Sequence, residues 1–149
     1  MKKFLLLSIL LTGFIVADCQ SKTNYAGDVD KVFGLIRNGA YKNGYDHLIS
    51  FANVNAAAIN VNPNTSYLIF FVYDNSSHPA AHFKAALMTP DSVLREKYTS
   101  RPFDRGQVGV ARAQQLQIRT PNFSVSKSKT RPVKFDATPK SMIYVFFKK

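Results

Sequence analysis

The pattern of apolar and polar positions first separates a leader from the rest of the chain. A predominantly apolar run covers residues 4–17 behind a short basic head, and the composition turns polar directly after the single cysteine, Cys19. This arrangement is typical of a secretory signal peptide, and the run is shorter than the roughly 20 apolar residues of a membrane-spanning helix. The pattern predicts three regions: a removed leader over 1–18, a tether over 19–27 and a single domain over 28–149.

The start of the domain has helical periodicity. Val29, Val32, Phe33 and Ile36 follow one another at the i, i+3, i+4, i+7 spacing of an amphipathic helix. Asp28 before them is a good N-cap, and Asn38–Gly39 is a typical helix exit. We expect an N-terminal helical segment here.

Shorter signals predict further helices. Apolar residues at 48, 49 and 51 suggest a short helix over 45–51. Pro79 and Pro90 each suit the first turn of a helix, the first carrying Phe83, Ala86 and Leu87 inward and the second Val93, Leu94 and Tyr98. These two helices would form a small insertion, followed by a loop over 99–106.

Strand signals dominate the rest. Residues 67–73 are aromatic, β-branched and apolar on both faces, so both sides of this strand should be covered. Further strands are expected over 58–61, 107–118, 123–125, 133–135 and 142–147. With about six strands, the fold class predicted is mainly β: a two-sheet β-sandwich with a small helical insertion and an N-terminal helical segment.

Composition and charge narrow the possible partners. The chain is 46% hydrophobic with a formal net charge of +11, and a single cysteine excludes an internal disulfide. Such a charge would suggest nucleic acid in a cytoplasmic protein, but the leader argues against it. The anions of a bacterial envelope are lipid phosphates, cell-wall carboxylates and acidic protein faces; the alternative is a solvated surface with no specific anion.

Cations are dense along the C-terminal strands. They are Arg112, Arg119, Lys127, Lys129, Arg131, Lys134, Lys140, Lys148 and Lys149. Aromatic residues lie among them, as in platforms that bind single-stranded nucleic acid: Phe123, Phe135, Tyr144 and Phe147. The alternation predicts instead that these aromatic rings point into the core and the cations point to solvent.

Candidate catalytic and metal-binding residues are few. His78 and His82 stand four residues apart, but a zinc site needs a third protein ligand, and the nearest candidate is Asp74. His47 lies beside Asp46 without any activated-nucleophile motif. We expect no enzyme activity, no metal, no other cofactor and no small-molecule substrate.

Cys19 is the predicted lipidation site. The sequence Val16–Ala17–Asp18–Cys19 resembles a bacterial lipobox, whose cysteine receives diacylglycerol and becomes the mature N-terminus, with palmitate as a typical label. Asp18 stands where such motifs usually have Gly or Ala. The alternative is cleavage by ordinary signal peptidase after Ala17, which would release a soluble periplasmic or secreted protein.

The order of these elements resembles a known family over residues 56–149. The residues that carry the resemblance are 58–63, 68–73, Phe83 with Leu87 and Leu94, 132–137 and 142–147. They are similar to the TssJ-type outer-membrane lipoprotein of type VI secretion systems. The resemblance implies a transthyretin-like sandwich that docks an inner-membrane secretion subunit with a periplasmic domain, partly through the loop Asn62, Pro63, Asn64 and Thr65.

The predicted function is therefore non-enzymatic tethering by protein–protein contact. The chain would be a lipid-anchored component of an envelope-spanning secretion apparatus, on the periplasmic face of the outer membrane. The alternative is a freely secreted or periplasmic basic module that binds an anionic polymer or a partner protein. Neither interpretation involves nucleic acid.

Overall fold

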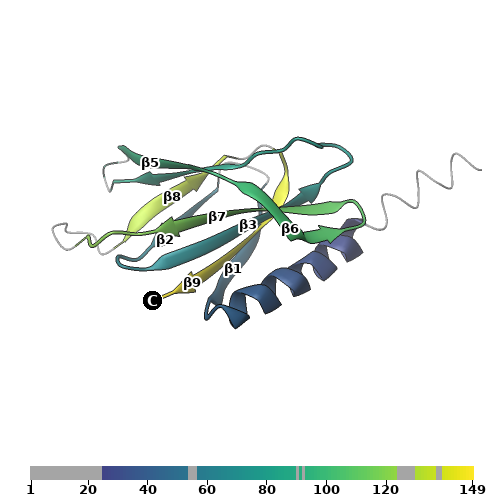
Figure 1. Ribbon diagram of the computed structural model, residues 1–149. Coiled ribbons are helices and arrows are strands. Elements are labelled where there is room, and N and C mark those ends of the chain that lie inside the picture. The colour runs from purple at the N-terminus through teal and green to yellow at the C-terminus, as the bar shows by residue number, and fades with distance from the viewer. Residues whose placement is uncertain (1–24, 54–56, 90, 92, 124–129, 137–138) are drawn as a thin grey trace, which may run out of the picture.

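The computed structural model describes residues 25–53, 57–89, 91, 93–123, 130–136 and 139–149. Over these residues the chain forms a helix, residues 25–42, followed by nine strands. The strands make two antiparallel sheets, so the fold is mainly β (Figure 1). The helix includes residues 25–27, the last part of the predicted tether.

The two sheets differ in size. Sheet A has five strands in the spatial order β1 (Asp46–Asn53), β9 (Ser141–Lys148), β3 (Ser66–Asp74), β7 (Ala111–Arg119) and β6 (Arg101–Val108). Sheet B has four strands in the order β2 (Ala58–Val61), β8 (Arg131–Phe135), β4 (Lys84–Met88) and β5 (Leu94–Thr99).

The main core lies between the two sheets. Alternate residues of β3 point toward sheet B, and Phe71 stacks on Phe83 with ring centroids 4.6 Å apart and planes 5° from parallel. Leu87 of β4, Val133 of β8 and Ile143 of β9 complete this layer, each fully buried. The packing of both sheets on one core is that of a β-sandwich, as the sequence predicts.

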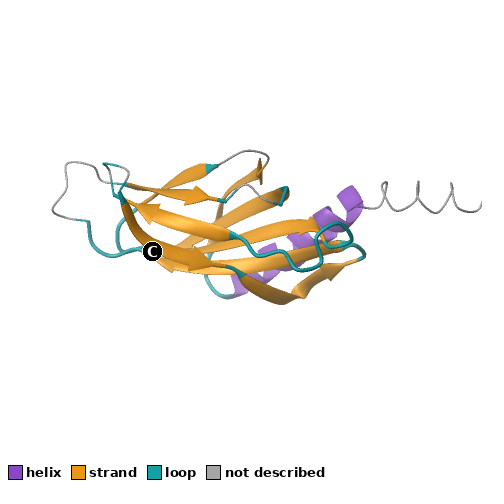
Figure 2. Ribbon diagram, turned by 90° about the horizontal axis from the view of Figure 1, so that it is seen from above, coloured by secondary structure: helices purple, strands orange, loops and turns teal. Residues whose placement is uncertain are grey.

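A second core lies on the other face of sheet A. Val32 and Ile36 of the helix are fully buried against Phe70 of β3 and Phe146 of β9. Figure 2 shows the helix running along the larger sheet, on the side away from the smaller one. The prediction that both faces of the strand over 67–73 are covered is confirmed, because the helix covers one face and sheet B the other.

The helix ends later than the sequence suggests. It runs through Asn38–Gly39 to residue 42, and Gly44 in the turn that follows has a φ of 75°. The amide of Tyr45 donates to the carbonyl of Ala40 at 3.0 Å, which closes the last turn. Ala40 is buried against sheet A, so packing extends the helix by one turn past the glycine.

The helix predicted over 45–51 is wrong, since residues 46–51 lie in β1. The ladder between β1 and β9 shifts register between His47 and Ile49, which is a β-bulge at Leu48. The bulge interrupts the period of two, so Leu48, Ile49 and Phe51 show a spacing that resembles a helix.

The small helical insertion is also wrong. The residues assigned to it form the antiparallel hairpin of β4 and β5 instead, and the described residues contain no second helix. Phe83, Ala85 and Leu87 are buried at a period of two, which is decisive for a strand. The predicted loop over 99–106 mostly belongs to β6. Phe123 lies outside the strands, and Val125 lies outside the described residues.

Candidate functional site

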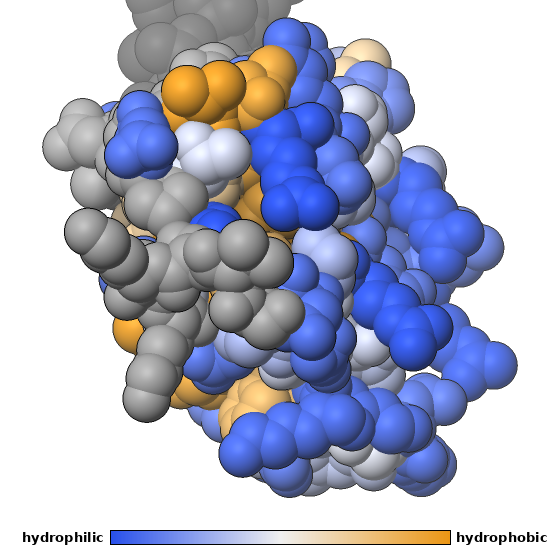
Figure 3. Space-filling view, turned by 90° about the vertical axis from the view of Figure 1, so that its left-hand side faces the viewer, coloured by the Kyte–Doolittle hydropathy of each residue, from blue (hydrophilic) through white to orange (hydrophobic). Residues whose placement is uncertain are grey.

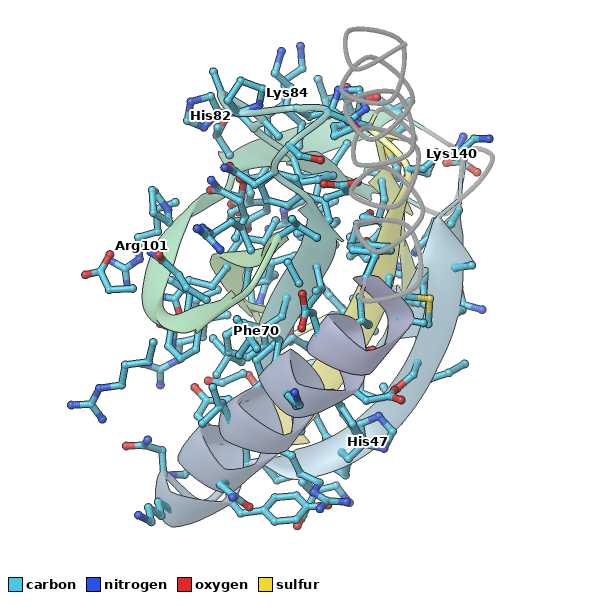
Figure 4. The ribbon with its side chains drawn as sticks, turned by 90° about the vertical axis from the view of Figure 1, so that its right-hand side faces the viewer. His47, Phe70, His82, Lys84, Arg101 and Lys140 are labelled. Atoms are coloured by element: carbon cyan, nitrogen blue, oxygen red, sulfur yellow. The ribbon has the colours of Figure 1, made fainter. Side chains whose placement is uncertain are left out.

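The outer face of sheet B is the large sheet surface that no other described element covers. Sheet A has the helix on its outer face, whereas the outward residues of sheet B remain exposed or half-buried. Three lysines on this face surround Ala86, and we call Lys84, Lys97, Lys134 and Ala86 the lysine face. Figure 4 shows Lys84 on the side of the molecule away from the helix, while Phe70 lies between the helix and the sheet.

Strand register brings these residues together. Lys134 of β8 pairs with Ala86 of β4, which in turn pairs with Lys97 of β5. Lys84 lies two residues before Ala86 and therefore on the same face. Because neighbouring strands are about 4.8 Å apart, the three lysine side chains leave the sheet from positions around the single methyl group of Ala86.

The lysine face is hollowed. A shallow cavity of about 360 Å³ lies over β4, β5 and β8, lined by all four of its residues together with Tyr98 and Asp136, among others. Seen from the end of the molecule that Figure 3 shows, the surface is mainly hydrophilic, with small apolar areas between the polar side chains.

The charge of the lysine face is unbalanced. Among the described residues, Asp136 is the only acidic one that lines the cavity, and its amide donates to the carbonyl of Lys84 at 2.9 Å. Like charges on neighbouring strands destabilise a sheet, so this cluster gives the fold no stability. It does create a positive potential that an anionic partner would relieve.

The acidic residue of β5, Glu96, lies on the face of the strand opposite the lysine face. Glu96 and Tyr98 alternate with Lys97 and so point away from the lysine face. The Tyr98 hydroxyl donates a hydrogen bond to the Glu96 carboxylate. Burial, followed by this bond, raises the pKa of Tyr98 to about 12. Tyr98 therefore stays a neutral donor to Glu96 at physiological pH.

The predicted docking loop is a short, hydrogen-bonded turn between β2 and β3. Asn62 and Asn64 are exposed, Pro63 is half-buried and Thr65 is buried. The amide of Thr65 donates to the Thr120 hydroxyl at 2.9 Å, and the amide of Thr120 donates back to the carbonyl of Thr65 at 3.0 Å.

This turn and the lysine face lie at opposite ends of β2. Ala58, the first residue of β2, pairs with Lys134, whereas Val61, the last, pairs with Arg131 and leads into the turn. The structure does not bring the two candidate surfaces together, so they can be tested separately.

The histidines lie in two separate parts of the fold. His78 and His82 are both exposed, in the segment between β3 and β4 and not on a helix. No group of three possible metal ligands occurs among the described residues. The Nε2 atom of His47 lies 2.8 Å from the Ser50 hydroxyl, and its ring packs edge-on against Phe33 and Phe146.

The orientation predicted for the C-terminal aromatics and cations is mostly observed. Phe123, Phe135 and Tyr144 are buried, and Lys134 and Lys148 are exposed. Lys127 and Lys129 lie outside the described residues. Arg131 departs from the prediction, because it is buried and lies over the ring of Phe123 at 4.7 Å.

These cations do not form one basic surface. Lys134 belongs to sheet B, whereas Lys148 belongs to sheet A and donates to the carbonyl of Asn43 at 3.0 Å. The sequence-based interpretation missed Lys84 and Lys97. The one available signal for Lys84 was its place between Phe83 and Ala85 in a stretch that can be read with a period of two, and the expected helix obscured it.

Cys19 lies outside the described residues. Within the described part of the chain, no helix has the length and apolar character needed to cross a membrane. No protein-family model matches the chain, and the comparison with curated proteins finds no match.

Proposed function

We propose that this chain is a non-enzymatic envelope protein that binds an acidic segment of a partner protein through the lysine face. The observation that carries the proposal is the gathering of Lys84, Lys97 and Lys134 around Ala86 on the uncovered side of sheet B. A lipid on Cys19 would hold the domain at a membrane, and such an anchor raises the local concentration of a weak binding face.

A protein partner suits this surface better than a lipid bilayer. The lysines are confined to one small cavity, and the same outward face includes the half-buried Met88 and Pro132. Neutral and apolar residues beside a few charges are typical of protein–protein interfaces, whereas electrostatic binding to a bilayer depends on a broader basic patch.

The proposal also includes a cellular location and a kind of partner. The predicted leader, the lipobox-like Cys19 and the resemblance to TssJ-type lipoproteins support a place on the periplasmic face of the outer membrane, with an inner-membrane secretion subunit as the partner. A transthyretin-like strand arrangement belongs to this proposal too, and the two-sheet sandwich is compatible with it. The exposed Asn62 and Asn64 would be a second contact.

Charge reversal with a matched control tests the lysine face. The variant Lys84→Glu/Lys97→Glu/Lys134→Glu removes it, while Lys31→Glu/Lys42→Glu/Lys140→Glu changes the net charge equally at exposed positions elsewhere. The probe is fluorescent poly-L-glutamate, and binding is followed by anisotropy at increasing salt. We expect the first variant to lose roughly tenfold or more in affinity and the control less than about threefold.

Two results would count against the proposal. Equal losses in both variants would show that net charge alone attracts the polyanion. Binding to phosphatidylglycerol vesicles that is stronger than binding to poly-L-glutamate, and that depends on the same three lysines, would replace the protein partner with a membrane surface.

A further inference from the structure

The sandwich has four edge strands, and three of them carry features that discourage pairing. β5 contains Arg95, Glu96 and Lys97; β6 contains Pro102 and several charges; and β2 is only four residues long. Charges, proline and short length are the usual protections against edge-to-edge association, because an edge strand presents unpaired backbone donors and acceptors.

β1 differs from the other three edges. It is eight residues long, has no lysine, arginine or proline, and carries one acidic residue, Asp46, at its first position. Leu48 and Ile49 are 46% and 44% exposed, which is high for large aliphatic side chains in a strand. β9 is its only neighbouring strand in the described part of sheet A, so one side of its backbone is open to another strand.

The positive charge of the chain limits the surfaces through which two copies can meet. With a formal net charge of +11, two copies of this protein repel each other over most of their surface. Within the described residues, β1 is the one long edge strand that contributes no cations to such a contact. A second copy therefore meets the least repulsion along β1.

The sequence of β1 is also complementary to itself. Ile49 and Phe51 pair with Val145 and Ile143 of β9, which point into the core, so both lie on the side of the strand that faces sheet B. In an antiparallel pair of β1 strands with a two-fold axis at Ser50, Ile49 of each copy lies opposite Phe51 of the other. Aliphatic–aromatic pairs of this kind stabilise a sheet, and Ser50 lies opposite its own symmetry mate.

We propose that two copies of this chain associate through antiparallel pairing of their β1 strands, with Ser50 on the two-fold axis. The five-stranded sheets then join into one continuous sheet. Both helices lie on one side of it and both lysine faces on the other. In so far as the proposed function holds, this arrangement presents two binding faces in the same direction, which increases avidity for a repeated partner.

A cysteine on the proposed axis tests the pairing. Cys19 is the only native cysteine, so the full chain in a Cys19→Ser background has no other thiol. In that background Ser50→Cys should form a disulfide-linked dimer on mild oxidation, because directly opposed residues of paired strands are about 4.5–5.5 Å apart at Cα, within disulfide range. Thr99→Cys, also exposed on an edge strand, is the matched control and should stay monomeric.

A second pair of variants separates pairing from chance collision. Ile49→Lys added to Ser50→Cys should reduce the linked dimer by roughly tenfold, since it places two lysines in the apolar layer. Leu94→Lys, at a residue of equal exposure (45%) on β5, should leave it unchanged. Circular dichroism melting checks that both variants fold, and neither result depends on binding to an anion.

Three outcomes would overturn the dimer. In the first, Ser50→Cys cross-links no more than Thr99→Cys, and in the second, Ile49→Lys leaves the cross-link intact. In the third, the thiol introduced at position 50 is protected from maleimide yet forms no dimer, which would show that something other than a second copy covers β1.

Discussion

The two sheets of this sandwich differ in what covers them, and the difference is visible in neighbouring residues. In β3 of sheet A, Phe70 and Phe71 are adjacent and both buried, because the helix covers one and sheet B the other. In β4 of sheet B, Lys84 is exposed and Ala85 is buried. A strand that is apolar on both faces is covered by its own chain, whereas one that alternates leaves a face for solvent or a partner.

Removing the central ring of the inter-sheet core should have the largest effect on stability. Phe71→Ala deletes the ring that stacks on Phe83 and contacts Phe135. We expect a loss of about 3–5 kcal/mol in the free energy of unfolding, measured by urea denaturation. A loss below about 1 kcal/mol would show that the two sheets do not share this core.

The helix cover of sheet A is tested by two neighbouring residues. Ile36 is fully buried, whereas Leu35 is 46% exposed. Ile36→Ala should lower the free energy of unfolding by about 2–4 kcal/mol. Leu35→Ala should change it by no more than about 0.5 kcal/mol. Urea denaturation measures both. Similar costs for the two variants would mean that the helix does not pack on sheet A through this face.

The connection of the helix to sheet A is tested at a glycine. Gly109 has a φ of 51°, and a Cβ atom there would collide with the Asp28 carboxylate, which accepts the amide of Val110 at 3.2 Å. Gly109→Ala should cost about 1–3 kcal/mol.

A helical glycine provides the control for that substitution. Gly34→Ala has open space around it and should stabilise the protein by about 0.5–1 kcal/mol. A cost for Gly109→Ala of less than about 0.5 kcal/mol would contradict the close contact between Asp28 and the β6–β7 turn. Thermal melting of both variants checks this pair.

Alkaline pH should lower the free energy of unfolding through two tyrosines, one in each sheet. Burial raises the pKa of Tyr144 in β9 and of Tyr98 in β5 to about 12. The ring of Tyr144 stacks on Phe33 of the helix, with ring centroids 4.5 Å apart. The unfolded tyrosines ionise near pH 10, so the unfolded state holds fewer protons above that pH.

The stability these groups contribute is therefore complete below about pH 10 and is lost as the pH rises toward 12. Tyr144→Phe should reduce the fall in Tm over this range. An unchanged fall in that variant would show that Tyr144 ionises normally in the folded protein.

The smallest effect on stability is expected on the lysine face. Lys97→Ala should change the free energy of unfolding by no more than about 0.5 kcal/mol, because the side chain is exposed and belongs to a cluster of like charge. The same variant should weaken poly-L-glutamate binding. A large destabilisation would mean that Lys97 has a structural role.

The elements that could be located from the sequence are those whose apolar pattern is the same in the sequence and in the folded protein. The continuous apolar strands β3 and β9 and the alternation of Val133 and Phe135 in β8 are examples. The helical insertion failed because Pro79 and Pro90 resemble helix starts, although here proline precedes strands. The bulge at Leu48 hid β1 in the same way.

The lysine face could not be predicted from the sequence. Lys84, Lys97 and Lys134 come from three strands, and only the register of β4 against β5 and β8 places them around Ala86. No spacing along the chain encodes that register. The dense C-terminal cations, by contrast, are conspicuous in the sequence but divided between the sheets.

Amide chemical-shift mapping by NMR during titration with poly-L-glutamate tests the central claim most directly. The largest shifts should fall on Ala86, Lys97 and Lys134, while residues 25–42 of the helix and the turn from Asn62 to Thr65 change little. Shifts centred on that turn or on the helix, with the lysine face unaffected, would contradict the assignment of the uncovered face of sheet B as the binding surface.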